Sequence, residues 1–331
     1  PFYCLSFCQN EVFYWQQTVG EGENSMLQRK DVLGLRDMTR EEILEILTVA
    51  QEMKKRIDHP ELRTSELHHT SIVTLFYENS TRTKTSFALA GKYLGATVQD
   101  LGISTSSVNK GESLIDTGKT LDQMGVEIMI MRNSYTGAPH VLARNVNAHV
   151  INAGDGSNEH PTQALLDLYT ILEYKKHFEG LKVAIIGDIS HSRVARSNVF
   201  GLQKLGAEVV LAGPSTLLGS AQLLGVKTTS DIREAVKDAD IVMGLRIQFE
   251  RQKTTNFPGI GEYRDLFGIN QEVLSYAKKD VLVMHPGPVN RGVELSGDVI
   301  DGQNSVINIQ VKNGVAVRMA ILKLLAKGGE A

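Results

Sequence analysis

The segment that decides the fold spans residues 71–94 and reads SIVTLFYENSTRTKTSFALAGKYL. Its first six residues are an apolar run with β-branched side chains, which is typical of a buried strand. After a polar turn, Phe87, Ala90, Gly91 and Leu94 recur at helical spacing. The segment therefore predicts a strand, a turn and a helix, the unit from which parallel sheets are built.

The same alternation continues along the chain. Short apolar runs of strand length stand between stretches of helical spacing, and this pattern predicts parallel sheets with helices on both faces. We expect a short strand at residues 98–101 and buried strands at residues 126–131, 150–151, 182–186, 208–211, 241–245 and 281–284.

Helix signals stand before, between and after these strands. Thr39, with Glu42 three positions later, is typical of a capping box, so a first helix is expected to begin there. Another helix is expected to begin near His160, and the periodic stretch at residues 315–326 predicts a terminal helix.

The length of the chain indicates its domain organisation. With 331 residues it is long enough for two domains of ordinary size. The sequence predicts an α/β protein of two domains, each a parallel β-sheet flanked by helices, with a ligand cleft between them. We place the first domain at residues 26–160 and the second at 161–310, with a helix at 311–331 packing back on the first. Residues 1–25 are expected to be an extension without chemistry, and Met26 the native start.

The composition restricts the classes of partner. With 35 Lys and Arg against 38 Asp and Glu, the net charge is −3, so the chain as a whole has no electrostatic reason to bind nucleic acid or an anionic membrane. No apolar run approaches the roughly 18 residues that suggest a bilayer span. The two cysteines, Cys4 and Cys8, precede the body of the chain, which excludes disulfides and thiolate metal sites there.

The polar turn of the opening segment is a candidate phosphate site. Ser80, Thr81, Arg82 and Thr83 follow a strand and open a helix, where backbone N–H groups and the positive end of the helix dipole favour anions. Three hydroxyls and a guanidinium within one turn are the donors that a phosphate requires. The alternative is a plain serine cap beside a solvated arginine.

A second polar loop, residues 104–112, carries Ser106 and Lys110 beside Gly111. Backbone N–H groups and an ammonium could meet an anion in this loop. A surface turn whose hydroxyls cap the next helix explains the same residues equally well.

Two isolated residues are expected to face the cleft. Arg132 ends an expected strand, and His160 opens the helix at the proposed domain junction. An arginine or a neutral histidine at such a place can donate a hydrogen bond to a carbonyl oxygen that gains charge. A purely structural role is an equal alternative for each of them.

The second half of the chain places arginines after two strands. Arg193 follows the strand at residues 182–186, in a turn that lacks the G-x-G-x-x-G spacing of dinucleotide-binding proteins. Arg246 and Gln248 follow the strand at residues 241–245. Because guanidinium groups match carboxylates, the two loops indicate a second substrate that is a dianion.

A rigid loop follows the last expected strand. The loop comprises His285, Pro286, Gly287 and Pro288, in which proline fixes the backbone and glycine permits unusual conformations. Backbone carbonyls there could accept hydrogen bonds from an amino or amide group.

No His, Asp and Glu set has metal-ligand spacing, and no nucleophile elbow or Walker loop occurs. We expect neither a metal nor a cofactor.

Taken together, these motifs resemble the catalytic chains of the aspartate carbamoyltransferase family in order and spacing, from about Met26 to the C-terminus. The carrying motifs are STRT at residues 80–83, HPTQ at 160–163 and HPGP at 285–288. In the ornithine branch of the superfamily the second motif usually reads HPCQ, and a cysteine follows the later histidine. Thr162 and Pro286 stand there in this chain, which disfavours that branch.

The resemblance implies a role for each matching residue. The phosphate of carbamoyl phosphate would be bound by Ser80, Thr81, Arg82 and Thr83. Its carbonyl would be polarised by Thr83, Arg132 and His160. Its amide would be held by Gln163 and by the backbone carbonyls of Pro286 and Gly287. The carboxylates of L-aspartate would be held by Arg193 and Arg246, with Gln248 nearby.

The resemblance also implies an assembly and a setting. Ser106 and Lys110 would reach into the active site of a neighbouring subunit, so a homotrimer with shared sites is expected. The implied setting is cytoplasmic, at an early step of pyrimidine biosynthesis. The resemblance leaves room for a larger assembly with regulatory or dihydroorotase chains.

Three other functions compete with this one. A carbamoyltransferase for another amino acid, such as ornithine, would share the phosphate site but needs no second arginine clamp. A non-catalytic carbamoyltransferase-like subunit is disfavoured because every implied catalytic side chain is present. A nucleotide-dependent oxidoreductase is disfavoured by the missing glycine fingerprint.

Overall fold

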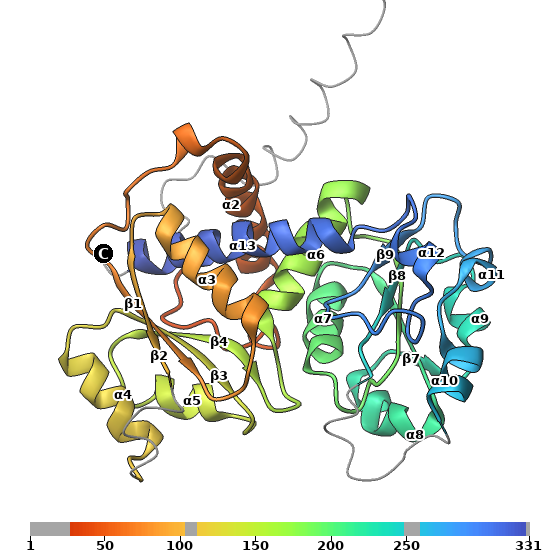
Figure 1. Cartoon of the computed structure of the whole chain (residues 1–331), viewed down its shortest axis with the longest axis horizontal. Coiled ribbons are helices and arrows are strands. Elements are labelled where there is room, and N and C mark those ends of the chain that lie inside the picture. The colour runs from red at the N-terminus through yellow and green to blue at the C-terminus, as the bar shows by residue number, and fades with distance from the viewer. Residues whose placement is uncertain (1–26, 103–110, 248–258, 329–331) are drawn as a thin grey trace, which may run out of the picture.

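The computed structural model describes residues 27–102, 111–247 and 259–328 (Figure 1). These residues form a four-stranded sheet of order β2-β1-β3-β4 and a five-stranded sheet of order β7-β6-β5-β8-β9. Every strand pair in both sheets is parallel. The predicted fold class, two parallel sheets flanked by helices, is confirmed.

The first sheet is built around residues 71–94, which form the strand, turn and helix that the sequence predicts. Its strands are β1 (Ser71–Phe76), β2 (Thr97–Leu101), β3 (Ile128–Asn133) and β4 (His149–Asp155). The helices connecting them are α3 (Thr81–Tyr93), α4 (Leu114–Gln123) and α5 (Ala138–Ala143). Strand β3 starts two residues later than predicted, because the Val126 N–H donates to Leu121 O in the turn after α4. It also runs past Met131, because Arg132 pairs with Phe76 of β1.

The second sheet follows the predicted alternation with one addition. Its strands are β5 (Lys182–Ile186), β6 (Glu208–Ala212), β7 (Lys227–Thr229), β8 (Ile241–Gly244) and β9 (Leu282–Met284). Around it lie α7 (Arg193–Lys204), α8 (Ser215–Leu218), η4 (Gly219–Leu224), α9 (Ile232–Val236), α10 (Ile260–Phe267), α11 (Gln271–Leu274) and α12 (Gly297–Ile300). The sequence analysis missed β7, an edge strand of three polar residues with no apolar run to reveal it.

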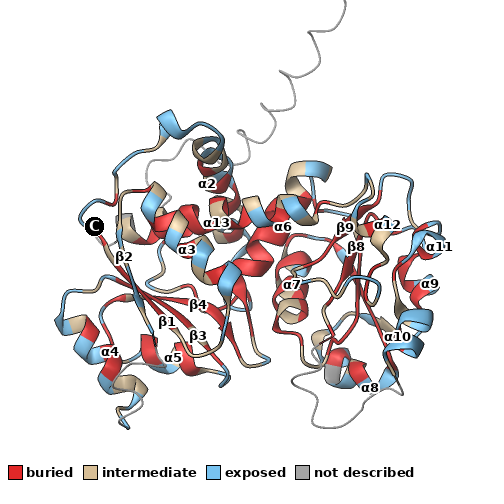
Figure 2. Cartoon of the chain, viewed as in Figure 1, coloured by how far each residue is buried: buried red, intermediate tan, exposed pale blue. Residues whose placement is uncertain are grey.

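Three long helices lie between and beside the sheets. They are α2 (Arg40–Asp58), α6 (Pro161–Lys175) and α13 (Ile307–Gly328), while the single turn η1 (Pro60–Leu62) follows α2. Helix α13 packs against α2, α3 and α6, and α6 packs against α7 (Figure 1). The inner residues of α6 are buried almost continuously (Figure 2). This helix therefore connects the two halves through a single apolar core.

The helix predicted to begin near His160 is α6, whose N-cap is His160, and the two other predicted helix starts compare differently with the structure. The capping box is confirmed, because Thr39 Oγ1 accepts from the Glu42 N–H at 3.2 Å and Glu42 Oε2 accepts from the Thr39 N–H at 2.7 Å. Helix α13 begins at Ile307, before the predicted stretch at 315–326. Its first turns bury Gln310 and Asn313, and these polar residues interrupt the apolar periodicity. Among the described residues, none of the helices combines the length and apolar character needed to cross a membrane.

Candidate active site

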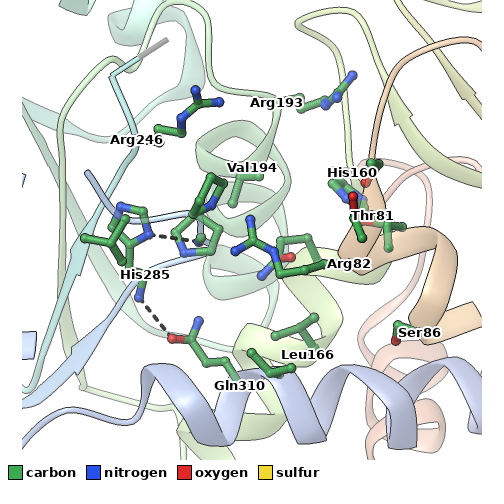
Figure 3. A pocket seen from close by; sticks show the side chains of 18 of the residues that line it. Thr81, Arg82, Ser86, His160, Leu166, Arg193, Val194, Arg246, His285 and Gln310 are labelled. Carbon is green, nitrogen blue, oxygen red and sulfur yellow. Dashed lines mark hydrogen bonds between the residues drawn. The ribbon is translucent and has the colours of Figure 1, made fainter. Parts of the chain in front are cut away.

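A cavity of about 810 Å³ lies between the two sheets, where the carboxyl ends of several strands and the starts of several helices meet (Figure 3). The described members of the predicted site all line this cavity: Ser80, Thr81, Arg82, Thr83, Arg132, His160, Gln163, Arg193, Arg246, Pro286 and Gly287. The other predicted site residues, Ser106, Lys110 and Gln248, lie outside the described residues. The structure thus brings together residues that are more than 200 positions apart in the chain.

The start of α3 faces the cavity. Ser80 is the N-cap, but its side chain makes no capping hydrogen bond. The interpretation of Ser80 as a plain side-chain cap is therefore wrong for this structure. The N–H groups of the first turn and the dipole of α3 favour an anion here.

Two guanidinium groups reinforce this positive field. Burial lowers the pKa of Arg82, and the nearby charge of Arg246 lowers it further. The two positive charges repel each other, and a bound anion nearby would offset this repulsion.

His160 lies at the start of α6 as a neutral ring. Its backbone N–H donates to Ser197 Oγ at 2.9 Å, and the residue is 4% exposed. Burial lowers its pKa well below the ordinary value, and the charges of Arg132, Arg193 and Arg318 act in the same direction. The buried Nδ1 atom has no hydrogen-bond partner among the residues that the structure describes. A neutral imidazole in this position can donate a hydrogen bond to the carbonyl oxygen of a substrate.

Glu78 connects two of the predicted arginines and was missed by the sequence analysis. Its Oε2 atom lies 2.7 Å from Arg193 Nη2 and 3.3 Å from Arg132 Nε. Arg132 Nη1 also donates to Ala153 O at 3.3 Å, and Arg193 Nη1 donates to Gly156 O at 3.3 Å. The sequence did contain a signal for Glu78, because this carboxylate stands just before the turn predicted to bind phosphate. A negative charge there would repel the anion unless cations pair with the carboxylate.

The loop after β9 approaches the start of α3. His285 Nδ1 accepts from the Gly287 N–H at 2.8 Å, and Gly287 has a φ of 68°. A Cβ atom on Gly287 would lie 2.4 Å from Arg82 Nη1. The positive φ favours glycine here, and a side chain at this position would also have to displace the Arg82 guanidinium.

Two other lining residues were missed because they belong to the terminal helix. Gln310 and Arg318 of α13 both line the cavity and are almost fully buried. Arg318 Nη1 donates to Ser86 Oγ of α3 at 2.9 Å. Neither residue stands near a motif in the sequence, so only the packing of α13 reveals them. In the described ranges, no three His, Cys, Asp or Glu side chains are grouped as a metal site would need.

Comparison with known proteins accounts for both halves of this arrangement. Residues 30–173 match the aspartate/ornithine carbamoyltransferase family model for the carbamoyl-P binding domain. Residues 179–325 match that family's Asp/Orn binding domain. The chain belongs to the aspartate/ornithine carbamoyltransferase family.

Relatives within this carbamoyltransferase family match nearly the whole chain. The aspartate carbamoyltransferase catalytic subunit of Ruminiclostridium cellulolyticum is 60% identical over 304 residues, which cover 92% of this chain and 97% of that relative. The catalytic subunit of Acetivibrio thermocellus is 58% identical, with coverage of 91% and 97%.

Solved carbamoyltransferase structures share the fold. Ornithine carbamoyltransferase from Pyrococcus furiosus superposes with a TM-score of 0.80 at 31% identity, covering 91% of this chain and 98% of that one. Aspartate transcarbamoylase from Trypanosoma cruzi, in complex with carbamoyl aspartate and phosphate, gives a TM-score of 0.80 at 28% identity with the same coverage. Both branches of the family therefore share this architecture, and the fold alone does not distinguish aspartate from ornithine as the acceptor.

Proposed function

We propose that this carbamoyltransferase transfers the carbamoyl group of carbamoyl phosphate to the α-amine of L-aspartate, giving N-carbamoyl-L-aspartate and phosphate. The observation that carries the proposal is the 60% identity, over 92% of the chain, to a catalytic subunit named for aspartate. The cavity supports it, because cationic groups from both sheets converge there. Thr162 and Pro286 stand where the ornithine branch usually has cysteine.

The phosphate is assigned to the start of α3, with Ser80, Thr81, Arg82 and Thr83 as donors. Their hydroxyls, the guanidinium of Arg82 and the first backbone N–H groups of the helix can surround a dianion. The uncommitted side chain of Ser80 supports this assignment.

The carbonyl oxygen of carbamoyl phosphate is assigned to Thr83, Arg132 and His160. The amine of aspartate attacks the carbonyl carbon, a C–N bond forms, and negative charge develops on the oxygen. Fixed donors aimed at this oxygen lower the barrier, by about 3 kcal/mol for a single good donor. The C–O bond to phosphate then breaks, and the departing phosphate takes the proton from the amine. No covalent enzyme intermediate is needed, because phosphate is already a good leaving group.

The carbamoyl NH₂ group is assigned to Gln163 and to the backbone carbonyls of Pro286 and Gly287. These acceptors come from α6 and from the loop after β9. Their separate origins allow the closed cavity to hold the carbamoyl group in one orientation, and fixed orientation alone can supply several kcal/mol.

The carboxylates of aspartate are assigned to Arg193 and Arg246, with Gln248 nearby. Arg246 lines the same cavity as Arg82 and affects its pKa, so a dianion beside the carbamoyl group would reduce the repulsion between them. Arg193 is already held by Glu78 from the other half of the chain. Closure of the two domains around both substrates would bring the amine to the carbonyl carbon.

The assembly and setting belong to the same proposal. We take the domains as residues 26–160 and 161–310, with the terminal helix returning to the first domain. A homotrimer would place Ser106 and Lys110 of one subunit in the site of its neighbour. The proposed setting is the cytoplasm, at an early step of pyrimidine biosynthesis. Regulatory or dihydroorotase chains are possible members of a larger assembly.

The decisive experiment is carbamoyl transfer by the purified chain, with carbamoyl phosphate fixed and three acceptors compared. Product with L-aspartate alone supports the substrate, the reaction and the arginine clamps together. Product with L-ornithine or N-acetylornithine would keep the phosphate site and overturn the roles of Arg193 and Arg246. No product with any acceptor would favour a non-catalytic subunit.

A further inference from the structure

A buried carboxylate lies behind the cavity and receives hydrogen bonds from three helices. Asp167 of α6 is 0% exposed. Its Oδ1 atom accepts from Gln163 Nε2 at 3.0 Å and from Gln310 Nε2 at 2.8 Å. Its Oδ2 atom accepts from Asn198 Nδ2 of α7 at 2.9 Å. Three amide NH₂ groups therefore converge on one carboxylate in the interior.

An ionised carboxylate can only accept hydrogen bonds, so it decides the orientation of each amide that faces it. Burial raises the pKa of Asp167 to about 6, and the three amide donors and Arg318 oppose that effect. Three amide donors on its two oxygens match the ionised carboxylate, which has only acceptor positions. With its NH₂ group committed to Asp167, the Gln163 amide carries its oxygen on the opposite side.

The second amide transmits this orientation to the loop after β9. Gln310 Oε1 accepts from the His285 backbone N–H at 3.0 Å (Figure 3). His285 Nδ1 in turn accepts from the Gly287 N–H at 2.8 Å. If the Gln310 amide were rotated by 180°, its NH₂ group would face the His285 N–H, and two donors would meet without an acceptor. Asp167 and the His285 N–H, one on each side of the Gln310 amide, therefore hold that amide in a single orientation.

Gln163 and Gly287 are the groups assigned above to the carbamoyl NH₂, so the following inference rests on the proposed function. We propose that Asp167 is a positioning residue for substrate selection: it orients the amide oxygen of Gln163 and, through Gln310, the backbone of residues 285–287 as acceptors for the carbamoyl NH₂ group. A carbamoyl donor is thereby distinguished from an acyl phosphate that has a methyl group in place of NH₂.

The test compares the binding of carbamoyl phosphate with that of acetyl phosphate, measured by titration calorimetry on the assembled enzyme without aspartate. Asp167→Asn preserves the shape but adds a donor, so the amides lose their single orientation. The preference for carbamoyl phosphate should fall about tenfold, the effect of roughly one or two misaligned hydrogen bonds. Acetyl phosphate affinity should change much less.

Asp240→Asn is the matched control. Asp240 is 5% exposed and accepts from the Lys182 N–H at 3.0 Å and from Lys278 Nζ at 2.7 Å. It precedes β8, at the end of the sheet away from the cavity. Asp240→Asn should lower the free energy of unfolding but leave the preference for carbamoyl phosphate over acetyl phosphate unchanged. An equal loss of preference in both variants would make the Asp167 effect merely structural and overturn the inference.

A double-mutant cycle tests whether Asp167 acts through Gln163. In a Gln163→Ala background, Asp167→Asn should reduce the remaining preference by only about threefold, since one of its two routes is gone. Fully additive losses would show that Asp167 does not act through Gln163.

Gln310→Met is the replacement variant if Asp167→Asn fails to fold. It breaks the second route, from Asp167 through Gln310 to the loop after β9, and should reduce the preference for carbamoyl phosphate about threefold. An unchanged preference in Gln310→Met overturns the inference.

The outcomes also separate this inference from the proposed function. A wild-type chain that carbamoylates aspartate and prefers carbamoyl phosphate, combined with an unaltered preference in Asp167→Asn, overturns the role of Asp167 alone. A wild-type chain that shows no carbamoyl transfer and no preference overturns both.

Discussion

Glu78 Oε2 lies 2.7 Å from Arg193 Nη2, and this ion pair joins the loop after β1 to the first residue of α7. The two residues lie beside different sheets, in the loop after β1 and at the start of α7, and are 115 positions apart in the chain. Arg193 is 4% exposed, so water does not readily replace its partner. The pair therefore constrains how the two halves of the site face each other.

Replacing this carboxylate should impair catalysis more than folding. In Glu78→Gln the charge that holds Arg193 and Arg132 is lost, and both guanidinium groups can leave their positions. We expect kcat/KM for aspartate to fall about tenfold to a hundredfold, the range for losing a buried hydrogen bond between charged groups. Steady-state kinetics measures this loss. Glu272→Gln, which breaks an exposed pair with Arg233, should leave kcat/KM unchanged; equal effects in both variants would contradict the prediction.

Arg246→Ala should weaken the binding of aspartate in particular. Arg246 lines the cavity after β8, so its loss removes one of the two carboxylate partners proposed for the substrate. The KM for aspartate should rise at least about tenfold, because a charge-assisted hydrogen bond contributes about 1.5 to 3 kcal/mol. Arg233→Ala, at an exposed arginine on α9, is the control. An unchanged KM for aspartate in Arg246→Ala would sink the assignment of this clamp.

The buried histidines should make the enzyme sensitive to acid. Burial lowers the pKa of His285 to about 3, and the charges of Arg82 and Arg246 contribute. Between the ordinary value of 6.5 and about 3, the unfolded chain binds a proton that the native chain does not. The free energy of unfolding therefore falls as the pH falls through this window, by about 1 kcal/mol per pH unit for one such group.

The variant His285→Asn keeps an acceptor but removes this titration. Urea unfolding between pH 7 and about 5 should show a shallower dependence than in the wild type. The exposed His68 offers the control variant His68→Asn. The slope that remains in His285→Asn should come partly from His160, whose pKa burial also lowers. Identical slopes in wild type and His285→Asn would show that His285 does not contribute.

The capping box of α2 should contribute to stability without affecting the site. Thr39→Ala removes the acceptor for the Glu42 N–H and should lower the free energy of unfolding by about 1 kcal/mol. Thr48→Ala, whose hydroxyl bonds Leu44 O within the same helix, should be close to neutral, because alanine is the better helix former. Equal losses of stability in the two variants would argue against the cap.

Much of the site could be predicted from the sequence because its residues occupy ends of elements. Strand-length apolar runs indicated where β1, β5 and β8 end, and ligands of parallel sheets bind at those ends. The turn from Ser80 to Thr83, His160, Arg193 and Arg246 all follow such runs or open the next helix. Local patterns of this kind report burial and periodicity, which depend on neighbours within a few residues.

The remaining features depend on pairings between distant segments, which local patterns do not encode. Glu78 became part of the site only through Arg193, and Gln310 only through the packing of α13 against α6. The packing of the Arg82 guanidinium against Gly287 joins the start of α3 to the loop after β9, two segments about 200 positions apart. The order of strands and helices and the chemistry of the motifs were thus readable from the residues alone. Which charges and amides face one another follows from the packed fold, because hydrogen bonds and ion pairs act over a few ångströms in space, at any separation along the chain.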